Sequence, residues 1–512
     1  MGTLSDFLTV NISTAPIAPV QPSFGVIMIL GAGRGAIGAF AGALIRYYTG
    51  IAAMLTDGYL ATDPEYIAAA SAFAQTPAPP QVAIGRRVNL PTMVETITVL
   101  SGGSAVWVAT TGYVAGNRAV NSGNVYVCTV PGTSAGSGGP SGTGSGIVDG
   151  GVTWSFDHQN TGKVYTVTVN STTKSYTTLA ADTNTLIATG LATAIGSATG
   201  FGAAVGAAAV VTITSSAAGN WGRFSVTNPN VDLDCKQTHV DAGVTSDINN
   251  ISISDNTWYG IISAWSSTAE VTALAAWTES NAKLYNAGTQ DSTCLSVGGG
   301  IAGTLKTSAY VRSPVWYHQD NGAGLDAGVM GNRFTYAPGS ENWMMVPLQG
   351  VPVMSLLSTT QVVNLKASNA NYYYSVGVSV TATGITPSGQ FIDTVRGRDW
   401  LASRIQNRIF AILINPASAA NPSNPGNSAP PLGKVPFTDP GISAVEGEVR
   451  AALQEGVDAG FLAASPKPSV TMPRASSLTS AQRSARTIPS GAFTGQIAGA
   501  INGATISGVV QF

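Results

Sequence analysis

The sequence predicts an α/β (α+β) protein whose core is built from the N- and C-terminal parts of the chain, with all-β modules inserted between them. At 512 residues the chain is too long for one ordinary core. Amphipathic helix patterns and apolar strand patterns occur in residues 23–90 and 246–498, whereas residues 91–245 carry short strand patterns rich in Thr, Ser and Gly. The 60 glycines favour β-rich domains with many turns over helical bundles.

These patterns divide the chain into six expected segments. Insertions are usually placed in loops, where added domains disturb the core least. The segments are residues 1–22, an N-terminal strand arm and linker; 23–90, the first part of the core; 91–160, a small β module; 161–245, a second module with β and α elements; 246–498, the second part of the core; and 499–512, a C-terminal strand arm.

Both arms alternate apolar and polar residues with the period of a β-strand. Three prolines between residues 16 and 22 join the first arm to the body as an extended linker. A strand with free edges either pairs within its own subunit or extends the sheet of a neighbour, and the residues alone leave both arrangements open. The candidate packing residues are Leu8, Val10 and Ile12 in the N-terminal arm and Ile506, Val510 and Phe512 in the C-terminal arm.

Residues 389–414 predict a long amphipathic helix that is entered through Asp393. Asp393, Arg396 and Asp399 lie three residues apart, so we expect their opposite charges to pair with each other on an outer, charged face. The apolar stripe comprises Leu401, Ile405, Ile409, Ile412 and Leu413, and the later turns carry Arg404 and Arg408.

Composition argues against several classes of function. Only 10% of the residues are charged and the formal net charge is −2, so no long-range field attracts nucleic acid. A mean hydropathy of +0.20 suits a subunit that is buried in a polymer.

Residues 191–213 are uncharged but interrupted by glycines, which predicts a helix, a turn and a strand, not a membrane span. Cys128, Cys235 and Cys294 are too widely spaced for a disulfide framework or a zinc site, and no secretion signal opens the chain.

No motif assembles a catalytic centre. Residues 33–38, Gly-Arg-Gly-Ala-Ile-Gly, follow an apolar strand and precede Asp57 as in a dinucleotide-binding fingerprint, but no second strand ends at that acid. Residues 132–136 match Gly-x-Ser-x-Gly without the helix that exposes a nucleophile. The three histidines have no metal-ligand spacing. We therefore expect no catalytic residue, cofactor, metal or enzymatic activity.

Four aromatic residues of the first module leave two interpretations open. They either line a sugar-binding surface or form the core of a small β module, which is the more common role for such residues. These residues are Trp107, Tyr113, Tyr126 and Trp154.

Six short motifs follow one another in a specific order. The best defined is Gly389–Leu401, in which a strand end, Gly-x-Phe-Ile-Asp, runs into Arg-x-x-Asp-Trp-Leu. The others are Tyr66–Arg86, Gly339–Val351, Asn371–Tyr374, Lys434–Ile442 and Arg483–Arg486. Together they resemble the contractile tail sheath proteins of bacteriophages over residues 1–90 and roughly 250–512. Related chains often carry Asp at the position of Gln482, so we expect no ion pair there in this chain.

The resemblance implies a structural role. A subunit of this kind polymerises helically, in hexameric rings, around a tail tube through exchange of its terminal strands, and contracts to drive the tube through the host envelope for genome delivery. Its implied partners are copies of itself, the tail tube protein, and the baseplate and tail terminator proteins, with no direct nucleic-acid contact and no membrane insertion. The implied location is the virion tail, after assembly in the bacterial host cytoplasm.

Two alternatives remain at the level of sequence. One is another virion structural protein, such as a decoration or receptor-binding protein, that uses the inserted β modules for recognition. The other is an oxidoreductase that binds a nicotinamide or flavin cofactor at residues 33–38.

Overall fold

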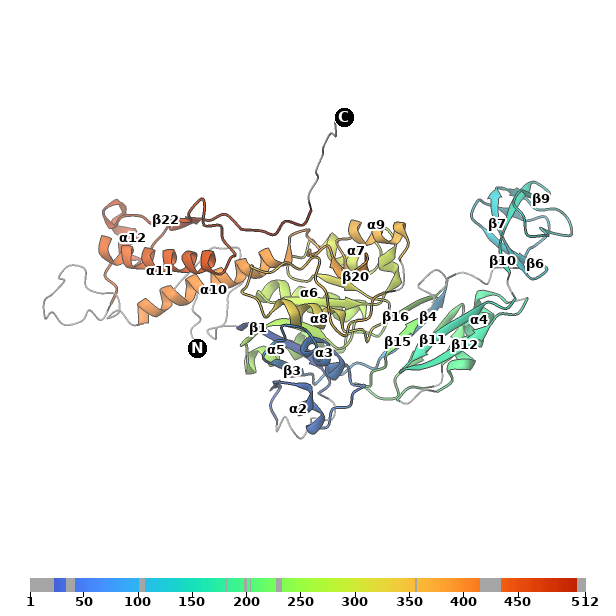
Figure 1. Ribbon diagram of the computed structural model, residues 1–512, viewed down its shortest axis with the longest axis horizontal. Coiled ribbons are helices and arrows are strands. Elements are labelled where there is room, and N and C mark those ends of the chain that lie inside the picture. The colour runs from blue at the N-terminus through green and yellow to red at the C-terminus, as the bar shows by residue number, and fades with distance from the viewer. Residues whose placement is uncertain are drawn as a thin grey trace, which may run out of the picture.

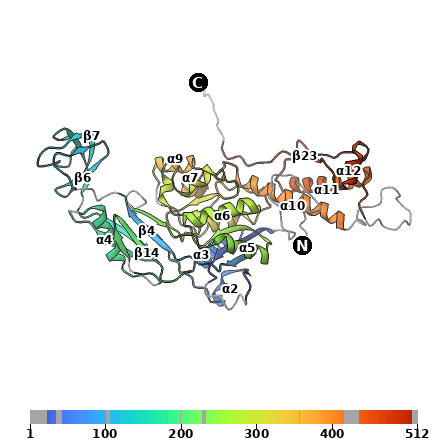
Figure 2. The same cartoon turned by 180° about the vertical axis from the view of Figure 1, so that it is seen from behind.

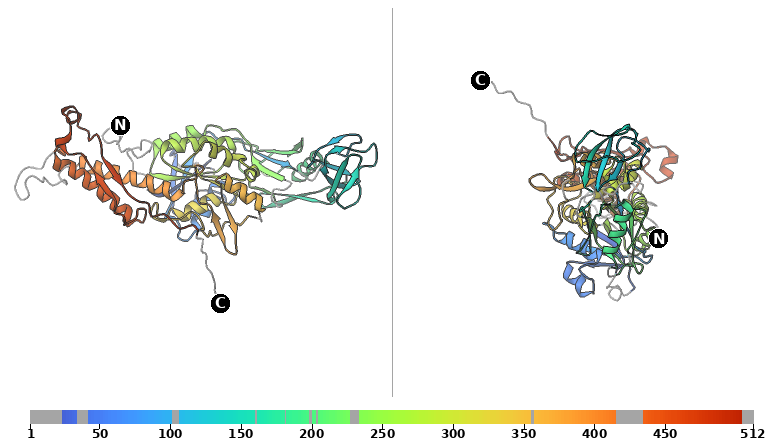
Figure 3. Two further views of the ribbon diagram at one scale, coloured as in Figure 1. Left: turned by 90° about the horizontal axis from the view of Figure 1, so that it is seen from above. Right: turned by 90° about the vertical axis from the view of Figure 1, so that its right-hand side faces the viewer.

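The computed structural model shows an elongated molecule with three parts along its long axis (Figures 1 and 3). A helical layer of C-terminal residues lies at one end, an α/β body lies in the middle, and smaller β units lie at the other end. The residues that the structure describes are 23–33, 42–100, 106–159, 161–180, 182–197, 200–202, 204–226, 233–354, 357–414 and 434–503.

The body is built on one sheet of eight strands in the order β2-β3-β1-β17-β18-β19-β20-β21. The strands from β3 to β20 run parallel, and one antiparallel strand closes each edge. In β1, Ile27 lies opposite Val82 on one side and Gly260 on the other, so distant parts of the chain share this sheet. The strands are β1 (Ser23–Gly31), β2 (Ile45–Tyr48), β3 (Val82–Arg86), β17 (Trp258–Ser263), β18 (Leu284–Thr289), β19 (Val315–Tyr317), β20 (Asn371–Ser375) and β21 (Ser379–Ala382).

Helices cover both faces of this sheet. Ile27 and Ile29 of β1 face a core shared with α3 and α8, whereas Met28 and Leu30 face a core shared with α5, α6 and α7. Burial on both faces explains why β1 is a continuous apolar run, and the arrangement confirms the mixed α/β class. The helices of the body are α2 (Ile51–Thr56), α3 (Pro64–Phe73), α5 (Val244–Ser254), α6 (Thr268–Asn281), α7 (Gly300–Thr307), α8 (Leu325–Arg333) and α9 (Thr359–Ala367), with a 3₁₀ turn, η2 (Ser292–Leu295).

The chain leaves the body after β3 and forms two further sheets, β13-β14-β4-β16 and β12-β11-β15, around a shared core. Helix α4 packs into this core, so this module contains both β and α elements, like the second segment described above, and the all-β description of the insertions does not apply to it. Gly196 ends α4 at a φ of 59°, and β14 follows, as the uncharged run predicted. The elements are β4 (Val94–Val99), β11 (Val164–Val169), β12 (Thr172–Thr177), α4 (Asn184–Ile195), β13 (Val205–Ala207), β14 (Val210–Thr214), β15 (Phe224–Val226) and β16 (Leu233–Gln237).

Residues 106–159 form a small unit at the tip of the molecule, and every regular element described there is a strand (Figure 1). Four strands pair in the order β6-β7-β10-β9, and β5 pairs with β8. The strands are β5 (Gly112–Tyr113), β6 (Arg118–Asn121), β7 (Asn124–Val130), β8 (Gly132–Thr133), β9 (Ile147–Asp149) and β10 (Val152–Gln159). Across the described part of the chain, no helix is long and apolar enough to cross a membrane.

Two long helices dominate the C-terminal layer, as Figure 2 shows from behind. Leu401, Ile405, Ile409 and Ile412 pack against the second long helix, which confirms most of the predicted stripe, but Leu413 lies outside it and is 38% exposed. The elements are α10 (Ile392–Ile414), α11 (Asp439–Asp458), β22 (Ser469–Thr471), a 3₁₀ turn η4 (Ala475–Ser477), α12 (Ser480–Ser484) and β23 (Ala492–Thr494).

The expected charged outer face of α10 is wrong for its first turns. Asp393, Arg396 and Asp399 are all buried, because α10 begins inside the body and leaves it only later. Arg396 pairs with Glu341 at 2.7 Å, and Asp399 pairs with Arg312 at 2.8 Å, so these charges do not pair with each other. The helix is therefore anchored to the body by buried ion pairs.

Candidate subunit interface

The six predicted arm residues, Leu8, Val10, Ile12, Ile506, Val510 and Phe512, lie outside the described residues. The structure does describe the segments from which the arms extend. The N-terminal arm precedes β1 in the body, and the described residues include the start of the C-terminal arm, residues 499–503.

A two-stranded ribbon of β22 and β23 lies on the outside of the C-terminal layer (Figures 1 and 2). Val470 lies opposite Phe493, and these two side chains pack towards the core between α10 and α11. The flanking residues, Ser469 and Thr494, are exposed. Within the described residues neither strand pairs with a third, so the ribbon has two outer edges, although the carbonyl of Val470 already accepts a hydrogen bond from Arg450 at 3.1 Å.

The segment after β23 runs back towards the body. Ile497 forms a bridge with Leu462, and the amide of Ala498 donates to the carbonyl of Phe461 at 2.9 Å. Further on, the Asn342 side chain donates to Asn502 at 2.7 Å. Between these two contacts Ile501 is 88% exposed. The C-terminal arm therefore departs from a tethered segment with an apolar side chain facing outward.

Ion pairs hold α10 against α11 beside the ribbon. Arg404 donates to Glu455 at 2.7 Å, and Arg408 contacts both Glu455 and Glu448. Hydrogen bonding, chiefly from Arg404, lowers the pKa of the Glu455 carboxyl below its ordinary value. These side chains are about one-third exposed, so solvent weakens each pair, but together they fix the register of the two helices.

The last part of the chain is basic. Residues 459–512 contain no Asp or Glu. Lys467, Arg474, Arg483 and Arg486 are exposed, and none forms a salt bridge with a described residue. Gln482, where the resemblance would place Asp, instead completes a capping box with Thr479 at the start of α12. The surface around α12 therefore presents positive charge that is free to meet an acidic partner.

Of the glycine-rich motif at residues 33–38, only Gly33 lies within the described residues. The amide of Gly33 donates to Oε1 of Glu65 at 3.0 Å, and a Cβ at Gly31 would lie 2.1 Å from that same oxygen. Burial raises the pKa of Glu65 to about 7. Asp57 does not end a strand: it follows α2 and pairs with Arg46 at 2.8 Å. A phosphate would have to displace Glu65, which argues against the dinucleotide site.

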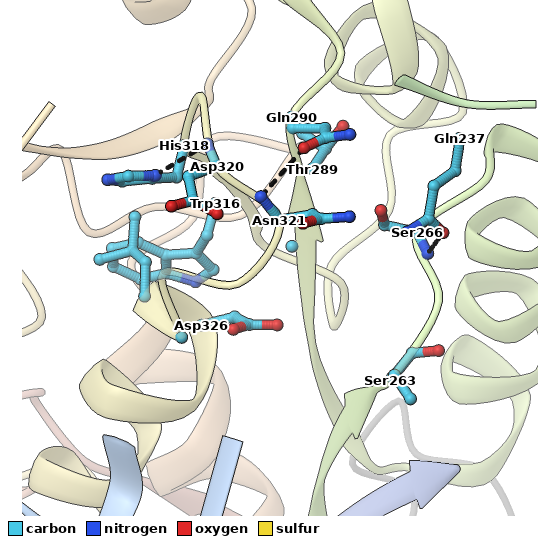
Figure 4. Close-up of a pocket in the computed structure, with 14 residues that line it drawn as sticks. Gln237, Ser263, Ser266, Thr289, Gln290, Trp316, His318, Asp320, Asn321 and Asp326 are labelled. Atoms are coloured by element: carbon cyan, nitrogen blue, oxygen red, sulfur yellow. Dashed lines mark hydrogen bonds between the residues drawn. The ribbon is translucent and has the colours of Figure 1, made fainter. Parts of the chain in front are cut away.

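The crevice beyond the carboxyl ends of β17, β18 and β19 is where open α/β sheets usually bind ligands (Figure 4). Here side chains leave a cavity of only about 40 Å³. His318 donates from Nε2 to the carbonyl of Pro352 and accepts the amide of Asp320 at Nδ1, so neither ring nitrogen is available as a base. The backbone N–H of Asn321 donates to the side-chain oxygen Oε1 of Gln290 across the same crevice. The crevice is filled by the chain itself.

The aromatic residues of the tip unit form its core. Trp107 and Trp154 both donate their indole N–H groups to the buried carboxylate of Asp149, at 2.7 and 3.0 Å. The ring of Tyr113 packs edge-on against Trp154 at 4.8 Å, and Tyr126 is fully buried. Tyr126 and Trp154 belong to the buried core of this unit, and Trp107 and Tyr113 are half-buried against it, so the structural interpretation is favoured.

No family model and no curated protein matches this chain. Among solved structures it is similar to the sheath tail protein of Listeria innocua, with 11% identity over 87% of this chain and 88% of that one at a TM-score of 0.41. It is also similar to the sheath tail protein of Desulfitobacterium hafniense, with 9% identity over 91% and 93% of the two chains at a TM-score of 0.40. A third is a chain of the anti-feeding prophage baseplate, with 14% identity over 53% and 72% at 0.38. Two of these three structures are named as sheath tail proteins.

Proposed function

We propose that this chain is a structural subunit of a contractile tail sheath that polymerises helically through exchange of its terminal strands. The observation that carries the proposal is the β22–β23 ribbon with two unpaired edges. A two-stranded sheet is marginal by itself, and further strands would stabilise it through main-chain hydrogen bonds. The arms of neighbouring copies supply such strands, with Leu8, Val10 and Ile12 or Ile506, Val510 and Phe512 facing the same core as Val470.

In this proposal contraction is a rigid-body movement of subunits about their arms. The body has cores on both faces of its sheet and joins the C-terminal layer through buried ion pairs, so it resists deformation. The residues before β1 and the segment after β23 would act as the tethers. No nucleotide is required, because the free energy for contraction is stored in the extended lattice when it assembles. It is released as the subunits gain contacts.

The basic surface around α12 is the part of the subunit that we assign to the tail tube protein. Its four cations complement an acidic tube surface, and contacts of this kind are weakened by salt. Rings of six subunits would stack around the tube between the baseplate and terminator proteins. The assembly would form in the bacterial cytoplasm, become part of the virion tail, and drive the tube through the host envelope for genome delivery.

The six-segment division of the chain belongs to the same proposal. Residues 23–90 and 246–498 would form the core, residues 1–22 and 499–512 the arms, and residues 91–245 the two inserted modules. The modules lie at the end of the molecule opposite the ribbon, so they would project from the lattice without taking part in strand exchange (Figure 3).

Electron microscopy of the purified chain tests the proposal. Wild-type protein should form long tubes, whereas chains lacking residues 1–15 or residues 502–512 should remain as single subunits or short rings. A chain lacking residues 106–159 is the control, because it loses a larger part of the molecule but keeps both arms. Long tubes from either arm deletion would show that strand exchange does not hold the lattice together.

A further inference from the structure

The unit built around α4, with strands β4 and β11 to β16, meets the body through several polar contacts. This α4 unit contributes β4, β15 and β16 to the joint, and the body contributes η2 and the loops after β18 and β19. Asp234 of β16 accepts from the backbone N–H and the hydroxyl of Ser292 in η2, at 3.1 and 2.6 Å. Arg223, just before β15, pairs with Asp320 after β19 at 2.7 Å.

Glu95 lies inside this joint. In β4 it is buried on the same face as Ile97 and Val99, so a carboxyl group takes the place of an apolar side chain. Its Oε1 accepts from the thiol of Cys235 at 3.0 Å and from the side-chain amide of Gln290. Its Oε2 is buried and has no hydrogen-bond partner among the described residues. Burying a carboxylate with one unpaired oxygen is costly, so these surroundings favour the protonated, neutral form.

Gln290 extends the contact of Glu95 through the body and back to the α4 unit. Its Oε1 accepts from the backbone N–H of Asn321 at 2.9 Å (Figure 4). The side chain of Asn321 in turn accepts from the backbone N–H of Phe224 at 3.0 Å and donates to the carbonyl of Gly222 at 3.2 Å. A chain of hydrogen bonds therefore joins Glu95 on β4 to the start of β15 through two residues of the body.

The charges around the joint also disfavour a carboxylate at this position. Burial, followed by the negative charge of Asp234, raises the pKa of Glu95 from 4.5 to about 8, although its two hydrogen bonds oppose the shift. The ammonium group of Lys236 lies 3.4 Å from both Asp234 and Asp291, and no cation of the described residues forms a salt bridge with Glu95. The other titratable or charged groups on the elements that pack here are Arg223, Cys294, Tyr317, His318, Asp320 and Asp326.

We propose that Glu95 is a proton-operated latch, which holds β4 and β16 against η2 and the loop after β19 while it is protonated and lets this contact open when it loses the proton. The two chain connections, where Arg87 pairs with Asp247 and Glu270, stay in place, so the α4 unit would pivot about them without unfolding. The ratio of open to closed joints should rise about tenfold for each pH unit between about 5.5 and 7. All of these contacts lie within one chain, so the latch would operate whether or not subunits polymerise.

The native cysteines test this directly. Cys235 is 2% exposed and contacts Glu95, whereas Cys128 lies in the core of the tip unit and is the internal reference. Labelling by dithiodipyridine, a disulfide reagent that reacts in acid, is followed at both ends of this pH range by peptide mass spectrometry. The reagent is kept dilute enough for the joint to reclose between reactions, and each rate is divided by that of the urea-unfolded chain at the same pH. We expect the corrected rate at Cys235 to rise roughly 25-fold and that at Cys128 to stay constant.

Two variants separate the latch from other titrations. E95Q keeps a neutral side chain of the same shape, so Cys235 should stay protected with no dependence on pH. Burial raises the pKa of Asp326 to about 6, so this group titrates in the same range, and D326N should leave the rise in place. The latch would be overturned by the absence of a rise in the wild type, by an unchanged rise in E95Q, or by loss of the rise in D326N. A matching loss of circular dichroism would mean that the chain unfolds as a whole, which also overturns it.

Discussion

The Glu341–Arg396 pair offers a quantitative test of how α10 is anchored. Glu341 is 3% exposed, and its Oε1 accepts from Arg396 and from the indole of Trp343, while Oε2 accepts the amide of Gly339 at 2.8 Å. In E341Q the side-chain oxygen of Gln can still accept hydrogen bonds from Arg396 and Trp343. Its NH₂ group, however, then points at the backbone N–H of Gly339, and two donors cannot bond to each other. The variant therefore leaves a buried donor unpaired and a buried guanidinium without its counter-charge.

The expected loss follows from these two effects. An unpaired buried donor costs about 1–3 kcal/mol, and breaking a buried ion pair by removing one partner costs about 3–5 kcal/mol in total. With a urea slope of about 3 kcal/mol/M, a loss of about 3 kcal/mol lowers the unfolding midpoint by about 1 M. Circular dichroism against urea measures this directly.

E446Q is the matched control. It makes the same chemical change next to an arginine, but Arg450 is 54% exposed and the pair spans one helical turn of α11. Such a pair contributes about 0.3–0.5 kcal/mol, so the midpoint should move by less than about 0.2 M. Equal shifts for E341Q and E446Q would refute the claim that the buried pair anchors α10.

Other variants test separate parts of the structure. Burial raises the pKa of Glu95 from 4.5 to about 8, so the folded chain keeps this proton to a higher pH than the unfolded chain does. The free energy of unfolding should therefore fall as the pH rises from 4.5 to about 8. E95Q should flatten this dependence on pH, and an unchanged slope in E95Q would contradict the assignment. R408A should destabilise the packing of α10 on α11 by about 1 kcal/mol, measured by hydrogen exchange in α11, because its partners are partly exposed. Deleting residues 106–159 should leave the urea midpoint of the remaining chain unchanged, since that unit has its own core; a shift would reveal a packing role. R483E combined with R486E should abolish co-assembly with tail tubes in low salt without altering circular dichroism, and normal co-assembly would exclude this surface as the tube contact.

Periodicity predicted the parts of the fold that depend on local pattern. The apolar run of β1, the stripe of Leu401, Ile405, Ile409 and Ile412, and the helix, turn and strand of residues 191–213 all follow from side-chain spacing and glycine placement. The arm residues remain predictions, because they lie outside the described part of the chain.

The long-range partners could not be predicted. Asp393, Arg396 and Asp399 have the spacing of an exposed charged face, and only the packing of the body shows that Glu341 and Arg312 lie opposite them. The same is true of Glu65 in α3, because the sequence does not show that its carboxylate accepts from the amide of Gly33 after β1. Spacing along one helix sets which residues share a face, but it carries no information about what that face meets.

The positions of the buried charges bear on how such a subunit would move. Arg87 pairs with Asp247 and Glu270 where the inserted residues leave and rejoin the body, and Arg396 pairs with Glu341 where α10 leaves it. A buried ion pair cannot stretch gradually, because separating the charges in a low-dielectric interior costs far more than separating them in water. Each junction is therefore held in one arrangement, whereas the ribbon edges and the segment after β23 depend on exposed backbone contacts that can be exchanged. A lattice of such subunits would rearrange at its tethers before its bodies deform.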